Sequence, residues 1–179
     1  MSGWVAFIRG INVGGNKIIP MKALAEACTA LGFREVRTYI ASGNVLFEAG
    51  GTKPEPLARR MEKAILETFG HEVTVIVRER QALESLAKTL PFGAAHREKD
   101  TKLYVAFFSA DASLKPKLPQ AFPADGLELL GAGERMAFFV ARPLNGKHVV
   151  PVLPLEKMFG VPAVTVRNWN TICKMLGSG

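Results

Sequence analysis

The order of apolar segments in the first 79 residues is the feature that most constrains the fold. Short apolar runs predict strands at residues 4–8, 36–40 and 45–48, and alternating valines predict a fourth strand at 73–77. Helical spacing of apolar residues predicts one helix over 20–31 and another after the Gly/Pro-rich link at 50–56. The resulting β-α-β-β-α-β order is typical of the split βαβ, or ferredoxin-like, arrangement.

The second half of the chain shows a related but weaker pattern. A short helix is expected at 83–90, a polar linker at 91–100, and a strand buried on both faces at 103–108. The remaining expected elements are a short helix at 111–120 interrupted by prolines, a hairpin of strands 127–130 and 136–141, and helices at 154–159 and 170–176. No residue-level repeat is visible between the halves.

We therefore expect an α+β protein with a ferredoxin-like N-terminal half, residues 1–90, packed on a related or degenerate α+β half, residues 91–179, in one compact unit. No apolar run is long enough to span a bilayer, and the N-terminus lacks the order of a signal peptide. These features predict a cytoplasmic protein without a membrane partner. Cys28 and Cys173 are expected to be reduced thiols in or near the core.

The net charge of +7 favours polyanionic partners without specifying one. Lysines and arginines are spread along the chain, with no basic tail or dense basic block. A nucleic-acid partner would therefore need a basic face formed by folding.

The first candidate binding motif lies between the first strand and the first helix and reads Arg9-Gly10-Ile11-Asn12-Val13-Gly14-Gly15-Asn16-Lys17. Glycines let backbone N–H groups converge, and a helix start adds unpaired donors, so this corner can hold an anion. The alternative is that the glycines only form a tight turn. The spacing matches neither a Walker loop nor a dinucleotide fingerprint. The candidate ligand residues here are Arg9, Asn12, Gly14, Gly15 and Lys17.

The second motif contains Arg37, Tyr39, Ser42 and Asn44, near the turn between the second and third strands. Arg37 and Tyr39 are expected on one strand face, with hydrogen bonds from Ser42 and Asn44 nearby. In the alternative interpretation Asn44 sets the turn and Arg37 is solvated.

The third motif contains Arg167, Asn168 and Trp169, at the start of the last helix. A guanidinium beside a helix start attracts anions, and the indole offers a flat face for stacking. The alternative is that Asn168 caps the helix and Trp169 anchors it on the core.

Candidate catalytic and metal-binding groups are sparse. His71, His96 and His148 are scattered without ligand spacing, so neither a metal nor a cofactor is expected. No nucleophile has an identifiable base. RNA-recognition modules share the β-α-β-β-α-β order, but their stacking aromatics on the third strand would fall on Ser42 and Asn44. We therefore do not expect recognition of single-stranded RNA in the usual way.

Together the three motifs resemble bacterial domain-of-unknown-function family 1697. The resemblance rests on residues 9–15, on the Tyr39-x-x-Ser42-Gly43-Asn44-x-x-Phe47 pattern, and on residues 167–171. It implies an α+β fold with a ferredoxin-like half in a small cytoplasmic bacterial protein, and no assigned activity. Family members often carry a Gly-Arg-Ser-Lys-Leu-like segment where this chain has residues 145–150, which include Lys147 and His148.

Four functional hypotheses follow. The leading one is a non-catalytic binding protein for a phosphate-bearing or other anionic ligand, held where the three motifs converge. The second is an enzyme acting on a nucleotide or phosphoester, which a carboxylate or histidine beside the motifs would favour. The third is nucleic-acid binding through a folded basic face. The fourth is a self-associating protein in which the motifs only shape turns.

Overall fold

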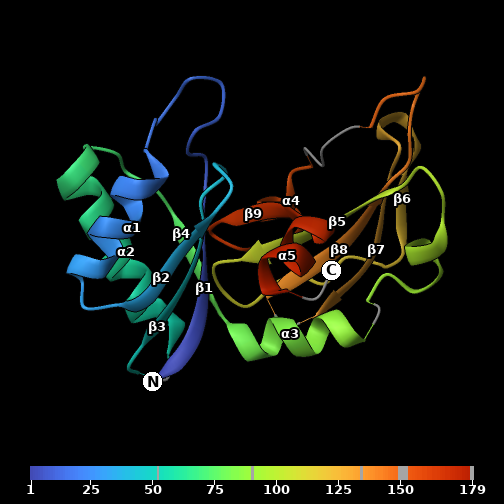
Figure 1. The fold of residues 1–179 in the computed structure, drawn as a ribbon. Coiled ribbons are helices and arrows are strands. Elements are labelled where there is room, and N and C mark those ends of the chain that lie inside the picture. The colour runs from blue at the N-terminus through green and yellow to red at the C-terminus, as the bar shows by residue number, and fades with distance from the viewer. Residues whose placement is uncertain (52, 90, 134, 149–152, 178–179) are drawn as a thin grey trace. The chain divides into compact units, whose positions relative to one another are not determined.

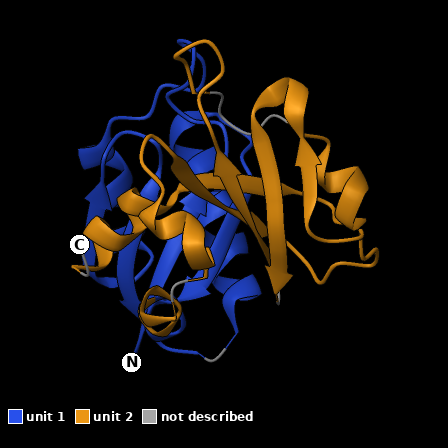
Figure 2. Cartoon of the chain, turned by 90° about the vertical axis from the view of Figure 1, so that its right-hand side faces the viewer, with its two compact units in different colours: residues 1–83 blue, residues 84–179 orange. Residues whose placement is uncertain are grey.

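Two antiparallel sheets, one in each half of the chain, organise the fold. The structure is a computed structural model that describes residues 1–51, 53–89, 91–133, 135–148 and 153–177. It contains five α-helices within these residues (Figure 1). The chain divides into two compact units, residues 1–83 and 84–179, which Figure 2 shows in different colours.

Unit 1 has a four-stranded sheet in the order β2-β3-β1-β4, with every neighbouring pair antiparallel. Its elements are β1 (Ser2–Ile8), α1 (Met21–Ala30), β2 (Arg34–Tyr39), β3 (Asn44–Ala49), α2 (Pro54–Phe69) and β4 (Val75–Glu79). The elements expected for this half are therefore present in the expected order. Helix α2 begins inside the segment expected to be a link, because a proline in the first turn loses no helical hydrogen bond.

The core of unit 1 lies between one face of this sheet and its two helices. Trp4, Ala6 and Ile8 alternate along β1 and belong to one buried apolar cluster. Leu24 of α1 and Met61 of α2 complete it, and both helices lie on the same face of the sheet in Figure 1. The helical periodicity of these apolar residues therefore determined which side of each helix is buried.

Unit 2 has a five-stranded sheet in the order β6-β7-β8-β5-β9, again antiparallel. Its helices and strands are α3 (Arg80–Lys88, which begins in unit 1), β5 (Lys102–Phe108), β6 (Gln120–Phe122), β7 (Leu127–Gly133), β8 (Met136–Ala141), α4 (Leu155–Phe159), β9 (Val164–Asn168) and α5 (Trp169–Leu176), with short 3₁₀ turns at Gly93–Arg97 and Pro123–Asp125.

Two expectations for this half are wrong. Residues 111–119 form no helix, because Pro116 and Pro119 remove backbone donors and clash with a helical turn. The segment expected to be a polar linker, 91–100, contributes Phe92 and Ala95 to the buried residues of the unit. Burial of these two apolar side chains packs the segment onto the unit, although most residues around them are polar.

The two units share a strand order and one short stretch of similar sequence. The order β7-β8-β5-β9 in unit 2 matches β2-β3-β1-β4 in unit 1. Trp4 pairs with Phe47 across β1 and β3, and Tyr104 pairs with Phe139 across β5 and β8. Aligned on this register, Trp-Val-Ala-Phe at residues 4–7 matches Tyr-Val-Ala-Phe at 104–107. The two units thus share the order of four strands, but the described residues of unit 2 form no α-helix between β5 and β7, where unit 1 has α1 between β1 and β2.

Both cysteines are free thiols, and Cys28 lies in the core of unit 1. Burial raises the pKa of the Cys28 thiol to about 12, so this group stays protonated at neutral pH. The expected place of Cys28 in the core is confirmed, and Cys173 is half-buried. No helix of the described residues combines the length and apolar character that crossing a membrane requires.

An arginine at the end of β8 ties the 91–100 segment to the sheet of unit 2. Arg142 donates to both carboxylate oxygens of Glu98, at 2.9 and 3.0 Å, and to Glu128 at 2.7 Å. These hydrogen bonds hold the pKa of the Glu98 carboxyl below its ordinary value. The ionised form therefore stabilises the fold, fully so above the ordinary pKa of a glutamate.

We expect the difference in melting temperature between the wild type and Glu98→Gln to be largest at neutral pH. Since the pKa of Glu98 is lowered by folding, its contribution is lost as the pH falls through that lowered value. The melting temperatures of the two proteins should therefore approach each other as the pH is lowered. Thermal unfolding of both between about pH 7 and pH 3 measures this. Glu67→Gln, which removes an exposed pair with Lys63, is the control and should change little.

Candidate functional site

The glycines of the first motif form the tip of a short hairpin. Val13 and Asn16 pair as an antiparallel bridge, with Gly14 and Gly15 between them at φ values of 58° and 77°. Two successive residues with positive φ are what a tight two-residue hairpin turn requires. The glycines therefore occupy turn positions between β1 and α1 and not the first turn of the helix. The tight-turn interpretation accounts for their conformation.

Asn12 fixes the base of this hairpin. Its side-chain amide donates to the carbonyls of Ile19 and Ala41, at 3.0 and 2.9 Å, and its Oδ1 accepts the Ile19 N–H at 2.8 Å. Its own backbone has a φ of 55°, which asparagine tolerates better than most residues. The Asn12 amide is thus engaged within unit 1. Helix α1 begins at Met21 without a side-chain cap.

The second motif also makes contacts inside unit 1. The Asn44 side chain is buried and donates to the Tyr39 carbonyl at 3.1 Å and to the Ser42 hydroxyl at 2.9 Å. Gly43 has a φ of 78°, and a Cβ there would also lie 3.1 Å from Ile8 Cβ, so this position favours glycine. Arg37 is exposed and pairs with Glu35 at 3.5 Å. These contacts agree with the turn-setting interpretation.

The third motif lies in unit 2. Asn168 caps α5 by accepting the Thr171 N–H at 3.2 Å, and Trp169 is buried with its ring 5.5 Å from that of Phe92. Arg167 donates to the Thr165 hydroxyl at 2.8 Å, and burial lowers its pKa to about 10. The capping and anchoring interpretation therefore accounts for Asn168 and Trp169.

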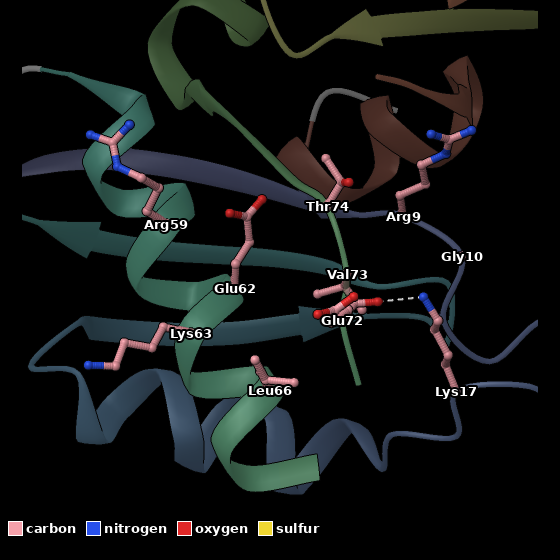
Figure 3. A pocket seen from close by; sticks show the side chains of 10 residues that line it. All are labelled: Arg9, Gly10, Lys17, Arg59, Glu62, Lys63, Leu66, Glu72, Val73 and Thr74. Atoms are coloured by element: carbon pink, nitrogen blue, oxygen red, sulfur yellow. Dashed lines mark hydrogen bonds between the residues drawn. The ribbon is translucent and has the colours of Figure 1, made fainter. Parts of the chain in front are cut away.

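An open cleft of about 760 Å³ brings charged side chains of unit 1 together (Figure 3). We call it the α2 cleft. Arg9 and Lys17 stand on one side, and α2 forms the other side with the residues that follow the helix lying between them. The full lining comprises Arg9, Gly10, Lys17, Arg59, Glu62, Lys63, Leu66, Glu72, Val73 and Thr74.

Hydrogen bonds hold both sides of the α2 cleft to its floor. Lys17 Nζ donates to the Glu72 carbonyl, and the backbone N–H of Arg9 donates to the Thr74 carbonyl at 2.9 Å. On the α2 side, Glu62 accepts the Val75 N–H at 2.9 Å. The connection between α2 and β4 is thereby fixed from both sides.

The α2 cleft contains four cationic and two carboxylate side chains, so it carries a positive excess. Arg59 and Arg9 lie on opposite rims in Figure 3, while Leu66 supplies an apolar surface that is 44% exposed. Such a site can attract an anionic group to its rims and offer carboxylates to hydroxyl or amino groups. Mixed polarity of this kind suits a small polar ligand.

Of the predicted site residues, Arg9 and Lys17 line the α2 cleft. The other predicted residues of unit 1 do not line it; these are Asn12, Gly14, Gly15, Arg37, Tyr39, Ser42 and Asn44. Arg167, Asn168 and Trp169 belong to unit 2.

Sequence reasoning missed the contribution of α2. Arg59, Glu62, Lys63 and Leu66 recur at helical spacing, on the side opposite the buried residues of the same helix. On sequence alone, charged residues at this spacing are typical of a solvated helix face. The spacing alone gives the shared face, but it does not reveal that β1 and the glycine hairpin lie across from it.

The altered segment after β8 forms a second tight turn. Leu144 and Lys147 pair across Asn145 and Gly146, and His148 Nε2 lies 2.6 Å from the Asp100 carbonyl. Residues 149 and 150 of this segment lie outside the described residues.

Across the described residues, no group of three or more His, Cys, Asp or Glu side chains is placed to hold a metal ion.

Comparisons with known proteins give a family and a fold. A family described as "Protein of unknown function (DUF1697)" matches residues 1–130, which confirms the resemblance; the third motif lies beyond this match. Among curated proteins, none matches the sequence. The structure is similar to that of a conserved bacterial protein from Streptococcus pneumoniae, with a TM-score of 0.67, 20% identity and 98% of each chain covered.

Proposed function

This chain belongs to the DUF1697 family of proteins of unknown function, so we propose its function from its own site. We propose that it binds a small phosphate-bearing or otherwise anionic ligand in the α2 cleft. The excess of cations in the α2 cleft is the observation that carries the proposal. Arg9 and Arg59 on opposite rims are the groups assigned to the anion, because guanidinium pairs well with phosphate oxygens.

We further propose a fold for each unit and a cellular location for the protein. The order β2-β3-β1-β4, with two helices on one face, supports a ferredoxin-like arrangement for unit 1. Unit 2 is proposed to be a degenerate copy of it, on the strength of its matching strand order. We place the protein in the cytoplasm, where small phosphorylated metabolites are its candidate ligands.

Thermal unfolding with orthophosphate, pyrophosphate, ribose 5-phosphate and ATP tests the binding site. A ligand at about 100 times its Kd stabilises the native state by about 2.7 kcal/mol, which raises the melting temperature by roughly 5–10 °C. The double variant Arg9→Gln/Arg59→Gln should lose this shift. Lys22→Gln, an exposed cation on α1 outside the α2 cleft, is the matched control and should retain it.

Potassium chloride at matched ionic strength accounts for general salt effects. An absence of any shift with all four probes would refute anion binding by this protein. A shift that persists unchanged in the double variant would show that the anion binds outside the α2 cleft.

A second candidate function is hydrolysis of a phosphoester, and the carboxylates beside Arg9 and Arg59 favour it. Glu62 is held by the Val75 N–H at 2.9 Å, so its carboxylate has a defined position from which it could act as a general base. We expect Glu62→Gln to lower the turnover of p-nitrophenyl phosphate about 100-fold while the thermal shift with phosphate remains. Glu67→Gln, on α2 but outside the cleft, should turn over the substrate at the wild-type rate. Wild-type protein without turnover would leave binding as the function.

A further inference from the structure

A second cleft, of about 630 Å³, opens within unit 2 and shares no lining residue with the α2 cleft. We call it the unit 2 groove. One wall is the irregular segment that follows β5, including Ala112 and Leu114. The other wall is the end of the β7–β8 hairpin, including Ala132, and Phe159 at the end of α4 also lines the groove. Its volume lies within the range of small-molecule sites.

The groove exists because the covering layer of unit 2 is thinner than that of unit 1. In unit 1, α1 covers the sheet after the first strand. In unit 2, the corresponding segment after β5 contains Pro116 and Pro119 and makes no helix. It is nevertheless held in place, because Leu114 N–H donates to the Phe159 carbonyl at 3.1 Å and Ser113 Oγ donates to the Gly160 carbonyl at 2.8 Å. The wall formed by this segment is therefore attached to the end of α4 by two hydrogen bonds.

The lining suits an apolar body. Phe159 belongs to the core cluster of unit 2, and Ala112 and Leu118 pack against that cluster, so the groove borders the core itself. Leu114 also lines it and is 52% exposed. A ligand that covers these side chains removes apolar surface from water on both partners.

One guanidinium at the groove already holds a carboxylate. Arg135 Nε donates to Asp111 Oδ1 at 2.8 Å; the Arg135 side chain is 28% exposed, whereas that of Asp111 is 86% exposed. The cation is thus mostly covered and its carboxylate partner mostly solvated, and pairs of such exposure contribute little to stability. Lys115 adds a second cation to the lining. A carboxylate brought by a ligand could replace that of Asp111 at small cost.

We propose that the unit 2 groove binds a small organic acid with an aliphatic or aromatic body. The body covers Leu114, Leu118 and Phe159, and the carboxylate takes the place of Asp111 on Arg135. Apolar burial supplies affinity, and the charge-assisted hydrogen bond supplies selectivity for acids over neutral molecules of the same size.

Titration calorimetry of the full-length chain with hexanoate, octanoate and octan-1-ol tests this assignment. Octanoate should bind about tenfold more tightly than octan-1-ol, and each methylene between hexanoate and octanoate should add about fourfold. Arg135→Gln should weaken octanoate about tenfold. Asp111→Asn should tighten it, because the competing carboxylate is gone. Opposite effects of two partners in one ion pair distinguish ligand exchange from general loss of structure.

Steric and charge controls locate the ligand. Ala132→Leu should abolish binding by filling the groove, and Leu114→Ala at its exposed rim provides a milder variant that should weaken it. Lys115→Gln should weaken binding, while Lys117→Gln on the same segment but outside the lining should leave it unchanged. Equal affinity for octanoate and octan-1-ol, or octanoate binding that survives both Ala132→Leu and Arg135→Gln, would overturn the proposal, as would no binding of either acid.

Discussion

Replacing Gly126 with alanine is expected to destabilise unit 2 by about 2–5 kcal/mol. Gly126 has a φ of 63°, and a Cβ there would lie 2.6 Å from the backbone carbonyl oxygen of Arg142. That oxygen cannot rotate away as a side chain could, because the Arg142 N–H is bonded to the Gly126 carbonyl at 2.8 Å. Either the turn before β7 or the end of β8 must shift. Urea unfolding followed by circular dichroism measures the loss.

Gly70→Ala separates the contact from the backbone conformation. Gly70 has a φ of 70°, and a Cβ there would meet no atom within 4 Å. This variant should therefore show only the cost of the left-handed conformation, about 1–2 kcal/mol. Equal losses in the two variants would show that close packing against Arg142 is not what requires glycine at position 126.

Truncation of Trp169 to alanine is expected to cost about 3–5 kcal/mol of stability. Its indole is buried and lies against Phe92, so removal leaves a cavity at the start of α5. Trp169→Phe keeps much of the packing and should cost clearly less. Chemical unfolding of both variants gives the two free energies.

The same pair of variants decides between the two interpretations of the third motif. A tryptophan that mainly stacks on a ligand would lose binding on truncation with little change in the free energy of unfolding. Asn168→Ala is the reference for the stability loss caused by a change at the helix start alone. Loss of its hydrogen bond to the Thr171 N–H is expected to cost about 1 kcal/mol. A Trp169→Ala loss no larger than that would contradict the anchoring role.

The structure shows why the glycine motif was only half interpretable. Gly14 and Gly15 have the positive φ of a tight turn, but a turn and an anion-binding corner both favour glycine, so the sequence left the two interpretations open. Asn12 holds the hairpin that carries these glycines in place, because its side chain donates to the carbonyl of Ala41, 29 positions along the chain. A contact over such a separation leaves no local signature. The α2 cleft was missed for a related reason, since Arg59 becomes part of a site only opposite Arg9.

By itself the sequence determined the local and periodic features of this protein. The apolar run at residues 4–8 specified β1 as a strand, and helical spacing in α2 specified its buried face, because side-chain direction follows directly from backbone geometry. The tertiary structure alone decided which charged surfaces meet and where the covering layer is thin. Those features depend on the pairing of segments distant in sequence, where burial of apolar surface outweighs local preference. The two clefts are therefore properties of the folded units, and the residues assigned to them could be chosen only once the strands were paired.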